Sequence, residues 1–273
     1  MTGKPDLILF AGPAILRAAD MAAIPWTNPT VCKMISGTGS DTFQAIAGSM
    51  RDGQGRILPN LVKTYAGGTL DDWGGIALAS FSAGWGLLNE VAKIPADVDR
   101  IVGMTAHDSA FGGSLQGYRS LADRAASRAD KVLVFTNTNN SANAAMGILR
   151  TGRETVQEVM LGAQTDTGIP LQQLSPRPPM PTPSGGVWGA GSLVWYDYVK
   201  PGSPANTGND LDDPPGSAHE HHNYLAPKVW EAYLVPAFAG SIPGTGPKLL
   251  DTIGMALLAV SVLAGLYLWS QRK

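Results

Sequence analysis

Short apolar runs alternate with amphipathic stretches through most of the chain. Six runs have the length and composition of strands that are buried on both faces, namely 6–11, 30–36, 76–81, 99–104, 131–136 and 192–199. The sequence favours helices at 14–23, 41–50, 57–65, 85–93, 115–130, 151–161 and 226–234. This alternation predicts an α/β fold in three layers, with a mostly parallel sheet covered by helices on both faces.

Three segments interrupt the alternation. An asparagine-rich stretch, 137–143, follows the strand predicted at 131–136, and a polar, acidic loop occupies 201–217. Residues 170–186 contain too much proline for a helix or a central strand, so we expect an excursion over the surface there.

A very tight turn separates the apolar run 76–81 from the helix predicted at 85–93. Only Ser82, Ala83 and Gly84 lie between the two elements. A serine on such a turn projects its hydroxyl above the edge of the sheet, and the turn accepts only small neighbours. Ser82 is therefore the candidate nucleophile. The alternative interpretation is that Ser80 and Ser82 cap a helix.

The pentapeptide Ser80-Phe81-Ser82-Ala83-Gly84 resembles the nucleophile elbow of the α/β-hydrolase superfamily, with Ser80 in place of the usual first glycine. The resemblance implies an acyl-enzyme mechanism and a Ser-His-acid triad. It also implies that the acid and then the histidine follow the nucleophile in the chain, at the carboxyl ends of the strands.

Three of the four histidines, His219, His221 and His222, follow the last predicted strand, where the family has its catalytic base. His219 is favoured because it follows three small residues just ahead of the final helix. His222 is the alternative base. A solvated loop, or a metal site formed with Glu220, also fits this cluster.

The loop at 137–140 carries no carboxylate, so Asp108, after the strand at 99–104, is the candidate acid. A turn-forming role for Asp108 is the other interpretation. Asn139 or Asn140 could orient a base less effectively. His107 is interpreted as a polar neighbour of Asp108.

An oxyanion hole requires two N–H donors, and the family resemblance places one of them at Ala83. The other is expected at Gly12, or at Ala11, because Pro13 has no N–H. Ala11-Gly12 stands here where the family usually has His-Gly.

Composition excludes some classes of function. The chain has 273 residues, and its net charge of −2 provides no basic face, so nucleic acid is not an expected partner. Cys32, the single cysteine, is expected to be a small buried hydrophobe, which excludes an intrachain disulfide. No cofactor is predicted.

Residues 252–269 contain no charged side chain and would span about 27 Å as a helix, enough for a single transmembrane anchor. The predicted division is a hydrolase-like domain at 1–239, a Gly/Pro linker at 240–250, a transmembrane helix at 251–270 and a basic tail at 271–273. Arg272 and Lys273 favour a cytoplasmic carboxyl terminus. No signal peptide is recognised at the amino end, so the side on which the domain lies stays open.

Residues 242–246, Ile-Pro-Gly-Thr-Gly, resemble a cell-wall sorting signal, which is an alternative interpretation of the tail. The arrangement would also suit a virus or phage product.

Three hypotheses follow. The first is a membrane-anchored serine esterase or lipase-like hydrolase, acting on a small-molecule or lipid ester. The second is a non-catalytic structural or binding protein on the same scaffold, such as a membrane-attached virion or surface component. The third is a metal-dependent hydrolase that uses His219, His221 and His222.

Overall fold

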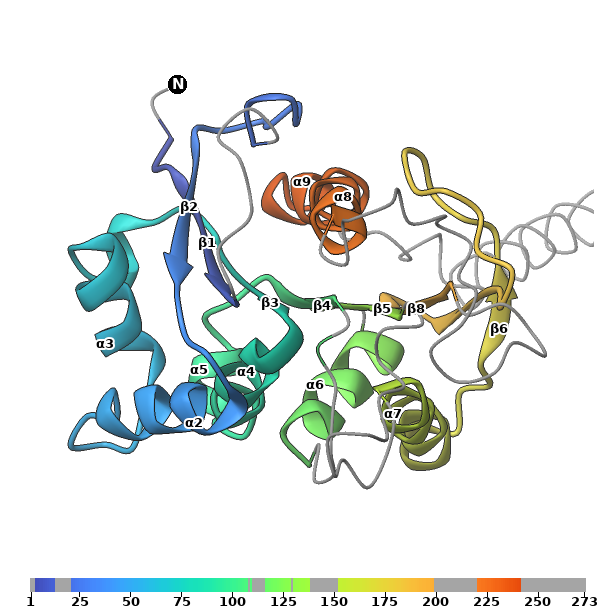
Figure 1. The fold of residues 1–273 in the computed structure, drawn as a ribbon, viewed down its shortest axis with the longest axis horizontal. Coiled ribbons are helices and arrows are strands. Elements are labelled where there is room, and N and C mark those ends of the chain that lie inside the picture. The colour runs from blue at the N-terminus through green and yellow to red at the C-terminus, as the bar shows by residue number, and fades with distance from the viewer. Residues whose placement is uncertain are drawn as a thin grey trace, which may run out of the picture.

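An eight-stranded sheet runs through the centre of the molecule (Figure 1). The computed structural model describes residues 3–12, 21–107, 109, 116–128, 130–137, 152–198 and 220–241, with backbone only for 116, 152 and 220–224. The strand order is β2-β1-β3-β4-β5-β8-β7-β6. The strands are β1 (Asp6–Ala11), β2 (Thr30–Ile35), β3 (Ile76–Phe81), β4 (Gly103–His107), β5 (Val132–Asn137), β6 (Gln172–Leu174), β7 (Val187–Ala190) and β8 (Leu193–Asp197).

Six of the strands are parallel, from β2 to β8 across the sheet, whereas β7 and β6 add an antiparallel edge. The carboxyl ends of the parallel strands therefore meet along one edge of the sheet. In open α/β sheets this edge is where ligands bind.

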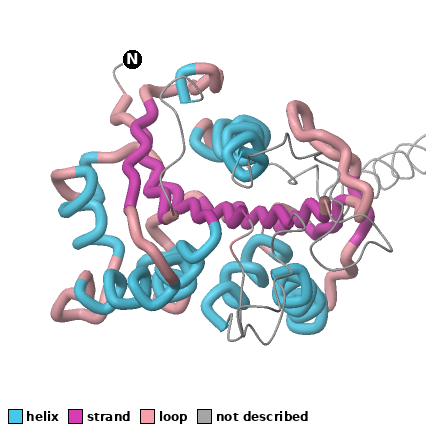
Figure 2. Tube along the Cα trace, viewed as in Figure 1, coloured by secondary structure: helices cyan, strands magenta, loops and turns pink. Residues whose placement is uncertain are grey.

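Helices cover both faces of the sheet (Figures 1 and 2). One face carries α2 (Ser40–Ser49), α3 (Leu58–Leu61), α4 (Trp85–Ala92), α5 (Pro95–Val98), α6 (Gln116–Ser127) and α7 (Gly152–Thr167), with the π-helix η1 (Val62–Ala66) continuing α3. The opposite face carries α8 (Glu220–Val229), the π-helix η6 (Trp230–Leu234) and α9 (Val235–Phe238). The predicted three-layer α/β architecture is confirmed.

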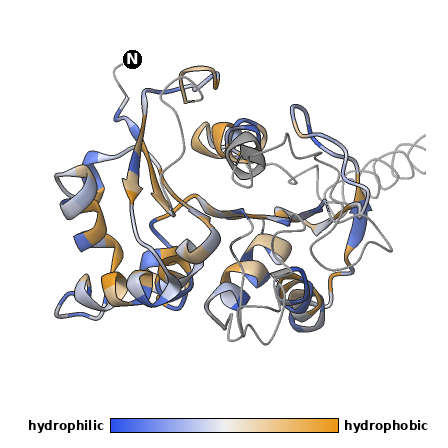
Figure 3. Ribbon diagram, viewed as in Figure 1, coloured by the Kyte–Doolittle hydropathy of each residue, from blue (hydrophilic) through white to orange (hydrophobic). Residues whose placement is uncertain are grey.

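The core has two parts, one on each side of the sheet, because successive side chains of a strand point to opposite faces. Leu7 and Leu9 belong to the part under α2 to α7, whereas Ile8 and Phe10 belong to the part under α8. Both parts are fully closed to solvent at β1, which explains why this strand has no polar position between Leu7 and Ala11. Figure 3 shows β1 and β2 coloured mainly as hydrophobic.

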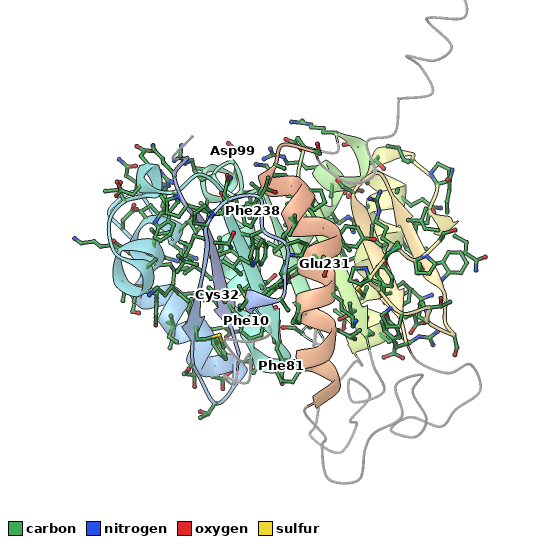
Figure 4. All side chains as sticks on the ribbon, turned by 90° about the horizontal axis from the view of Figure 1, so that it is seen from above. Phe10, Cys32, Phe81, Asp99, Glu231 and Phe238 are labelled. Atoms are coloured by element: carbon green, nitrogen blue, oxygen red, sulfur yellow. The ribbon has the colours of Figure 1, made fainter. Side chains whose placement is uncertain are left out.

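The helix formed by α8, η6 and α9 runs along the strands in the opposite direction. Trp230 packs edge-to-face on Phe10 with ring centroids 5.8 Å apart, and Phe238 lies against Gly75, just ahead of β3. Figure 4 shows this helix crossing the sheet from the end near Phe81 to the end near Phe238. The first turn of α8 consequently begins at the carboxyl edge of the sheet.

One predicted strand lies further along the chain than expected. The strand predicted at 99–104 is present as β4, but it starts only at Gly103 and continues to His107. Pro95 opens the short helix α5 instead, and Asp99 follows in a turn, where it accepts a hydrogen bond from Arg124 at 2.6 Å. Thr105 and His107 lie in the buried strand because their polar atoms hydrogen-bond to each other.

The proline-rich stretch 170–186 was expected to contain no helix or central strand, and the structure places only the short edge strand β6 within it. β6 pairs with β7 at the edge of the sheet, where proline-rich sequence is tolerated because one side of the strand needs no partner. The helix α7 runs on to Thr167, beyond the predicted end at 161.

Among the described helices, none combines the length and the apolar character that a membrane span requires. The predicted transmembrane segment, the linker beyond residue 241 and the sorting-signal-like residues 242–246 lie outside the described residues, as does the acidic loop 201–217.

Candidate active site

The turn after β3 holds its serine in an unusual backbone conformation. Ser82 has φ 50°, and among the described residues it is the one non-glycine with a positive φ. β3 ends at Phe81, a single 3₁₀ turn covers Ser82–Gly84, and α4 begins at Trp85. A left-handed conformation costs a residue with a Cβ about 1–2 kcal/mol, and such residues gather at functional sites.

Close packing around this turn explains its small residues. A Cβ on Gly84 would stand 1.9 Å from the carbonyl oxygen of Ala11, at the end of the neighbouring strand β1. A Cβ on Gly86, in the first turn of α4, would stand 2.8 Å from the carbonyl oxygen of Ser40. Only glycine lets the turn approach β1 and α2 so closely.

Ser82 and Ala83 are both partly exposed, whereas Ser80 is completely buried. The side chain of Ser82 therefore does not lie in the core. Ser80 stands where the nucleophile-elbow motif has its first glycine, and its Oγ accepts a hydrogen bond of 2.7 Å from the Ser109 hydroxyl. The strand, tight turn and helix predicted around Ser82 are all present.

His107 is buried in the core between two threonines. Its Nδ1 lies 3.1 Å from Thr136 Oγ1 and its Nε2 lies 3.2 Å from Thr105 Oγ1. Trp230 Nε1 donates to the same Thr105 hydroxyl at 3.1 Å, which joins the network to the final helix. Because both ring nitrogens are engaged, His107 has the role of a core polar residue and not of a base.

Two of the late histidines belong to a helix and not to the predicted loop. α8 begins at Glu220, so His221 and His222 are in its first turn. The final helix was predicted to start only at residue 226, so it begins six residues earlier than expected. His219 and the side chains of His221 and His222 lie outside the described residues.

The backbone shows how far α8 extends along the strand direction. Trp230 contacts Thr105, which pairs through the sheet register with Ala79 of β3. Ser82 lies three residues beyond Ala79, about 10 Å further along the strand direction. His222 lies eight residues before Trp230 in the antiparallel helix, about 12 Å in the same direction. The first turn of α8 and Ser82 therefore lie at similar positions along the strand direction, at the carboxyl edge of the sheet.

The candidate acid Asp108 lies outside the described residues, as do Asn139 and Asn140. Asn137, which had been assigned to the loop, is instead the last residue of β5 and fully buried, and its Oδ1 accepts a hydrogen bond of 2.8 Å from Trp195.

The prediction that Gly12 contributes to an oxyanion hole is not supported by its hydrogen bonding. The N–H of Gly12 donates to the carbonyl oxygen of Ile35 at 3.1 Å and so extends the ladder between β1 and β2. A donor used by the sheet on the β2 side does not point toward Ser82 on the β3 side. Ala83, directly after Ser82, stays the candidate donor.

No family model matches the chain, and no curated protein matches it. Among solved structures it is similar to the crystal structure of LpqC, a poly(3-hydroxybutyrate) depolymerase from Bordetella parapertussis. The identity is 11%, the TM-score is 0.38, and the match covers 90% of this chain and 82% of that one. A likeness at this score does not bear on function.

One buried carboxylate at the carboxyl edge was not singled out by the sequence. Asp197, the last residue of β8, is 1% exposed and accepts hydrogen bonds from Arg153 Nε at 2.8 Å and Nη2 at 2.7 Å. β8 lies three strands from β3, about 14 Å away across the sheet. The pair joins the first turn of α7 to β8. The position of Asp197 at the end of an apolar run could have indicated a buried carboxylate. Its partner could not be identified from the sequence, because Arg153 lies 44 residues away.

Within the part of the chain that the structure describes, no three His, Cys, Asp or Glu side chains gather as a metal site would require. The cluster of His219, His221 and His222 lies outside that part. Cys32 is only partly buried on β2, where a buried side chain was expected. Desolvation still raises the pKa of its thiol to about 12, so the thiol stays protonated at neutral pH.

Proposed function

We propose that this protein is a serine hydrolase that acts on esters through an acyl-enzyme. The observation that supports it best is the conformation of Ser82: a strained, partly exposed serine on a three-residue turn, at the carboxyl edge of an inner parallel strand. A plain helix cap does not need a positive φ, because an N-cap serine adopts an extended backbone. The cap interpretation of Ser82 therefore has less support.

In the proposed reaction, Ser82 Oγ attacks the ester carbonyl carbon while a histidine takes the hydroxyl proton. That proton passes to the leaving alcohol as the acyl–oxygen bond breaks. Water then attacks the acyl-enzyme and gives a proton to the histidine, and the histidine passes that proton to Ser82 Oγ as the acyl–Ser82 bond breaks and the acid is released. The Ala83 N–H stabilises the oxyanion in both steps.

His219 is the proposed base and Asp108 the proposed orienting acid, with His222 as the alternative base. The antiparallel course of α8 supports a base from this segment, because it brings the first turn of the helix to the height of Ser82. Small-molecule or lipid esters are the proposed substrates.

A fluorophosphonate probe followed by peptide mass spectrometry tests the proposal. We expect the probe to label the peptide that contains Ser82, and Ser82→Ala to abolish labelling while the protein stays folded. His219→Ala and His222→Ala are compared with each other, and the substitution that prevents labelling identifies the base. A wild-type protein that is folded and unlabelled would rule out the serine mechanism.

A non-catalytic binding protein on the same scaffold is the second candidate. The engagement of the Gly12 N–H in the sheet favours it, because an oxyanion hole needs a second donor besides Ala83. The unlabelled result above supports this candidate. Hydrolysis that a chelator stops, without labelling of Ser82, would instead support the metal-dependent hydrolase.

Attachment to a membrane through residues 252–269 is part of the proposal and has its own test. An arginine at the centre of a transmembrane helix costs about 2.5–3.5 kcal/mol of insertion free energy. We expect the full chain to stay with membranes after alkaline carbonate washing and Val260→Arg to release a substantial part of it. Release of the wild-type chain by the same wash would contradict the anchor.

A further inference from the structure

A hydroxyl from the segment after β4 contacts the main chain of the Ser82 turn. Ser109 is 1% exposed, and its Oγ lies 2.7 Å from Ser80 Oγ and 2.8 Å from the carbonyl oxygen of Ser82. Ser80 is completely buried. The contact joins two loops at the carboxyl edge, one after β3 and one after β4.

Ser109 is the donor in both contacts. A carbonyl oxygen can only accept, and a serine hydroxyl has one hydrogen, so the Ser109 hydroxyl shares that hydrogen between the carbonyl oxygen of Ser82 and Ser80 Oγ. The Ser82 carbonyl also accepts from the N–H of Trp85, so both of its lone pairs are used.

Holding this carbonyl also holds the neighbouring N–H. The peptide between Ser82 and Ala83 is planar, so the carbonyl of Ser82 and the N–H of Ala83 point in opposite directions along one rigid unit. A rotation of that peptide would turn the N–H of Ala83 away from its position and break the bond to Ser109. The left-handed φ of Ser82 leaves the turn strained, and a strained turn persists only where its surroundings fix it.

We propose that Ser109 is a positioning residue that aims the Ala83 N–H at the developing oxyanion through the carbonyl of Ser82. This inference rests on the proposed serine hydrolase function. Ser80 Oγ is the second acceptor of the Ser109 hydroxyl and holds that side chain beside the Ser82 turn, which gives a physical reason for a serine at a position where the elbow motif has glycine. Ser109 touches neither the substrate nor the reacting atoms, and it acts through the peptide plane between Ser82 and Ala83.

The test compares Ser109→Ala with a matched buried serine at the other end of the sheet. Ser192 is completely buried, and its hydroxyl donates to main-chain carbonyls, with Ala125 O at 3.0 Å. Ser192→Ala thus removes the same kind of hydrogen bond from a place remote from Ser82. Ser80→Ala is the third variant, because it leaves the donation from Ser109 to Ser82 in place.

Hydrolysis of p-nitrophenyl acetate and the rate of fluorophosphonate labelling are measured for the wild type and the three variants, with rates corrected for the folded fraction. Loss of an oxyanion donor lowers kcat about 100- to 1,000-fold, and a misdirected donor loses part of this. We expect Ser109→Ala to lower kcat at least about tenfold with KM nearly unchanged. Ser192→Ala should leave both unchanged, and Ser80→Ala should have a small effect on kcat.

Two outcomes would overturn the inference, and they are distinct. If the wild type is labelled and Ser109→Ala reacts as fast as Ser192→Ala, Ser109 is merely structural and the serine mechanism survives. If the folded wild type is neither labelled at Ser82 nor active on the ester, the proposed function fails and the positioning role fails with it.

Discussion

Gly84 and Ala11 meet so closely that a Cβ at position 84 would stand 1.9 Å from the Ala11 carbonyl oxygen. Ala11 ends β1 and Gly84 ends the turn that carries Ser82, so this contact presses the turn onto the neighbouring strand. The positive φ of Ser82 and the glycine at 84 are two parts of one backbone arrangement.

Gly84→Ala should therefore destabilise the protein strongly, by about 3 kcal/mol or more, because the contact is with main-chain atoms that cannot move aside. Urea unfolding of the two proteins measures the difference. Gly48→Ala is the matched control, since a Cβ there meets nothing within 4 Å and alanine is favoured over glycine in the helix α2. Equal stability of Gly84→Ala and wild type would contradict the packing described around Ser82.

His107→Ala should reduce stability without removing the proposed chemistry. The imidazole lies between the hydroxyls of Thr105 and Thr136 in a buried strand, so its loss costs about 2 kcal/mol of unfolding free energy. Fluorophosphonate labelling of the folded variant should proceed at close to the wild-type rate. Complete loss of labelling in folded protein would make His107 part of the catalytic machinery.

The pair of Arg153 and Asp197 should matter more for stability than its surface counterparts. Arg153→Ala removes two hydrogen bonds from a carboxylate that is 1% exposed, so a loss of about 2 kcal/mol is expected. Arg119→Ala breaks the pair with Asp166, in which both side chains are over a third exposed, and should cost under about 1 kcal/mol. Thermal unfolding of the two variants at one pH ranks their stabilities. A larger loss of stability in Arg119→Ala than in Arg153→Ala would contradict the prediction.

Asp6 should give the protein a measurable dependence of stability on pH. Burial raises the pKa of this carboxyl, although hydrogen bonds from Asn28 and Gly75 act in the opposite direction. A raised pKa in the folded state means that its contribution is most favourable below about 3.8, the ordinary value, and is lost as pH rises through the raised value.

Asp6→Asn removes the buried charge, and the amide of Asn28 can rotate to provide an acceptor. We expect the variant to be more stable than the wild type at pH 7, with the difference shrinking as the pH falls toward 4. Urea unfolding at several pH values measures it. A variant that is less stable at every pH would show that the hydrogen bonds of the carboxylate outweigh the cost of burial.

Some elements were readable from the sequence because their cause is local. β1 and β3 have the predicted bounds, Asp6–Ala11 and Ile76–Phe81, since each is an apolar run that ends at small residues or glycine. Ser82 was singled out as the candidate nucleophile for the same reason: the three residues between strand and helix leave the chain few conformations.

β4 was placed four residues too early because its position depends on a partner and not on its own composition. The register pairs Gly103 with Ala77 and His107 with Phe81, and this pairing makes a strand of polar residues that had been assigned to a loop. β6 was missed because its short, partly exposed sequence forms a strand only against β7.

By itself, the sequence determined the class of fold, the candidate nucleophile and its small neighbours, since local packing and turn geometry leave their mark on adjacent residues. Only the tertiary structure decided that the Gly12 N–H belongs to the sheet, that Asp197 pairs with Arg153 and that Ser109 holds the carbonyl of Ser82. The reason is physical, because each of these hydrogen bonds joins segments that lie 23 or more residues apart and meet only when neighbouring strands and helices pack.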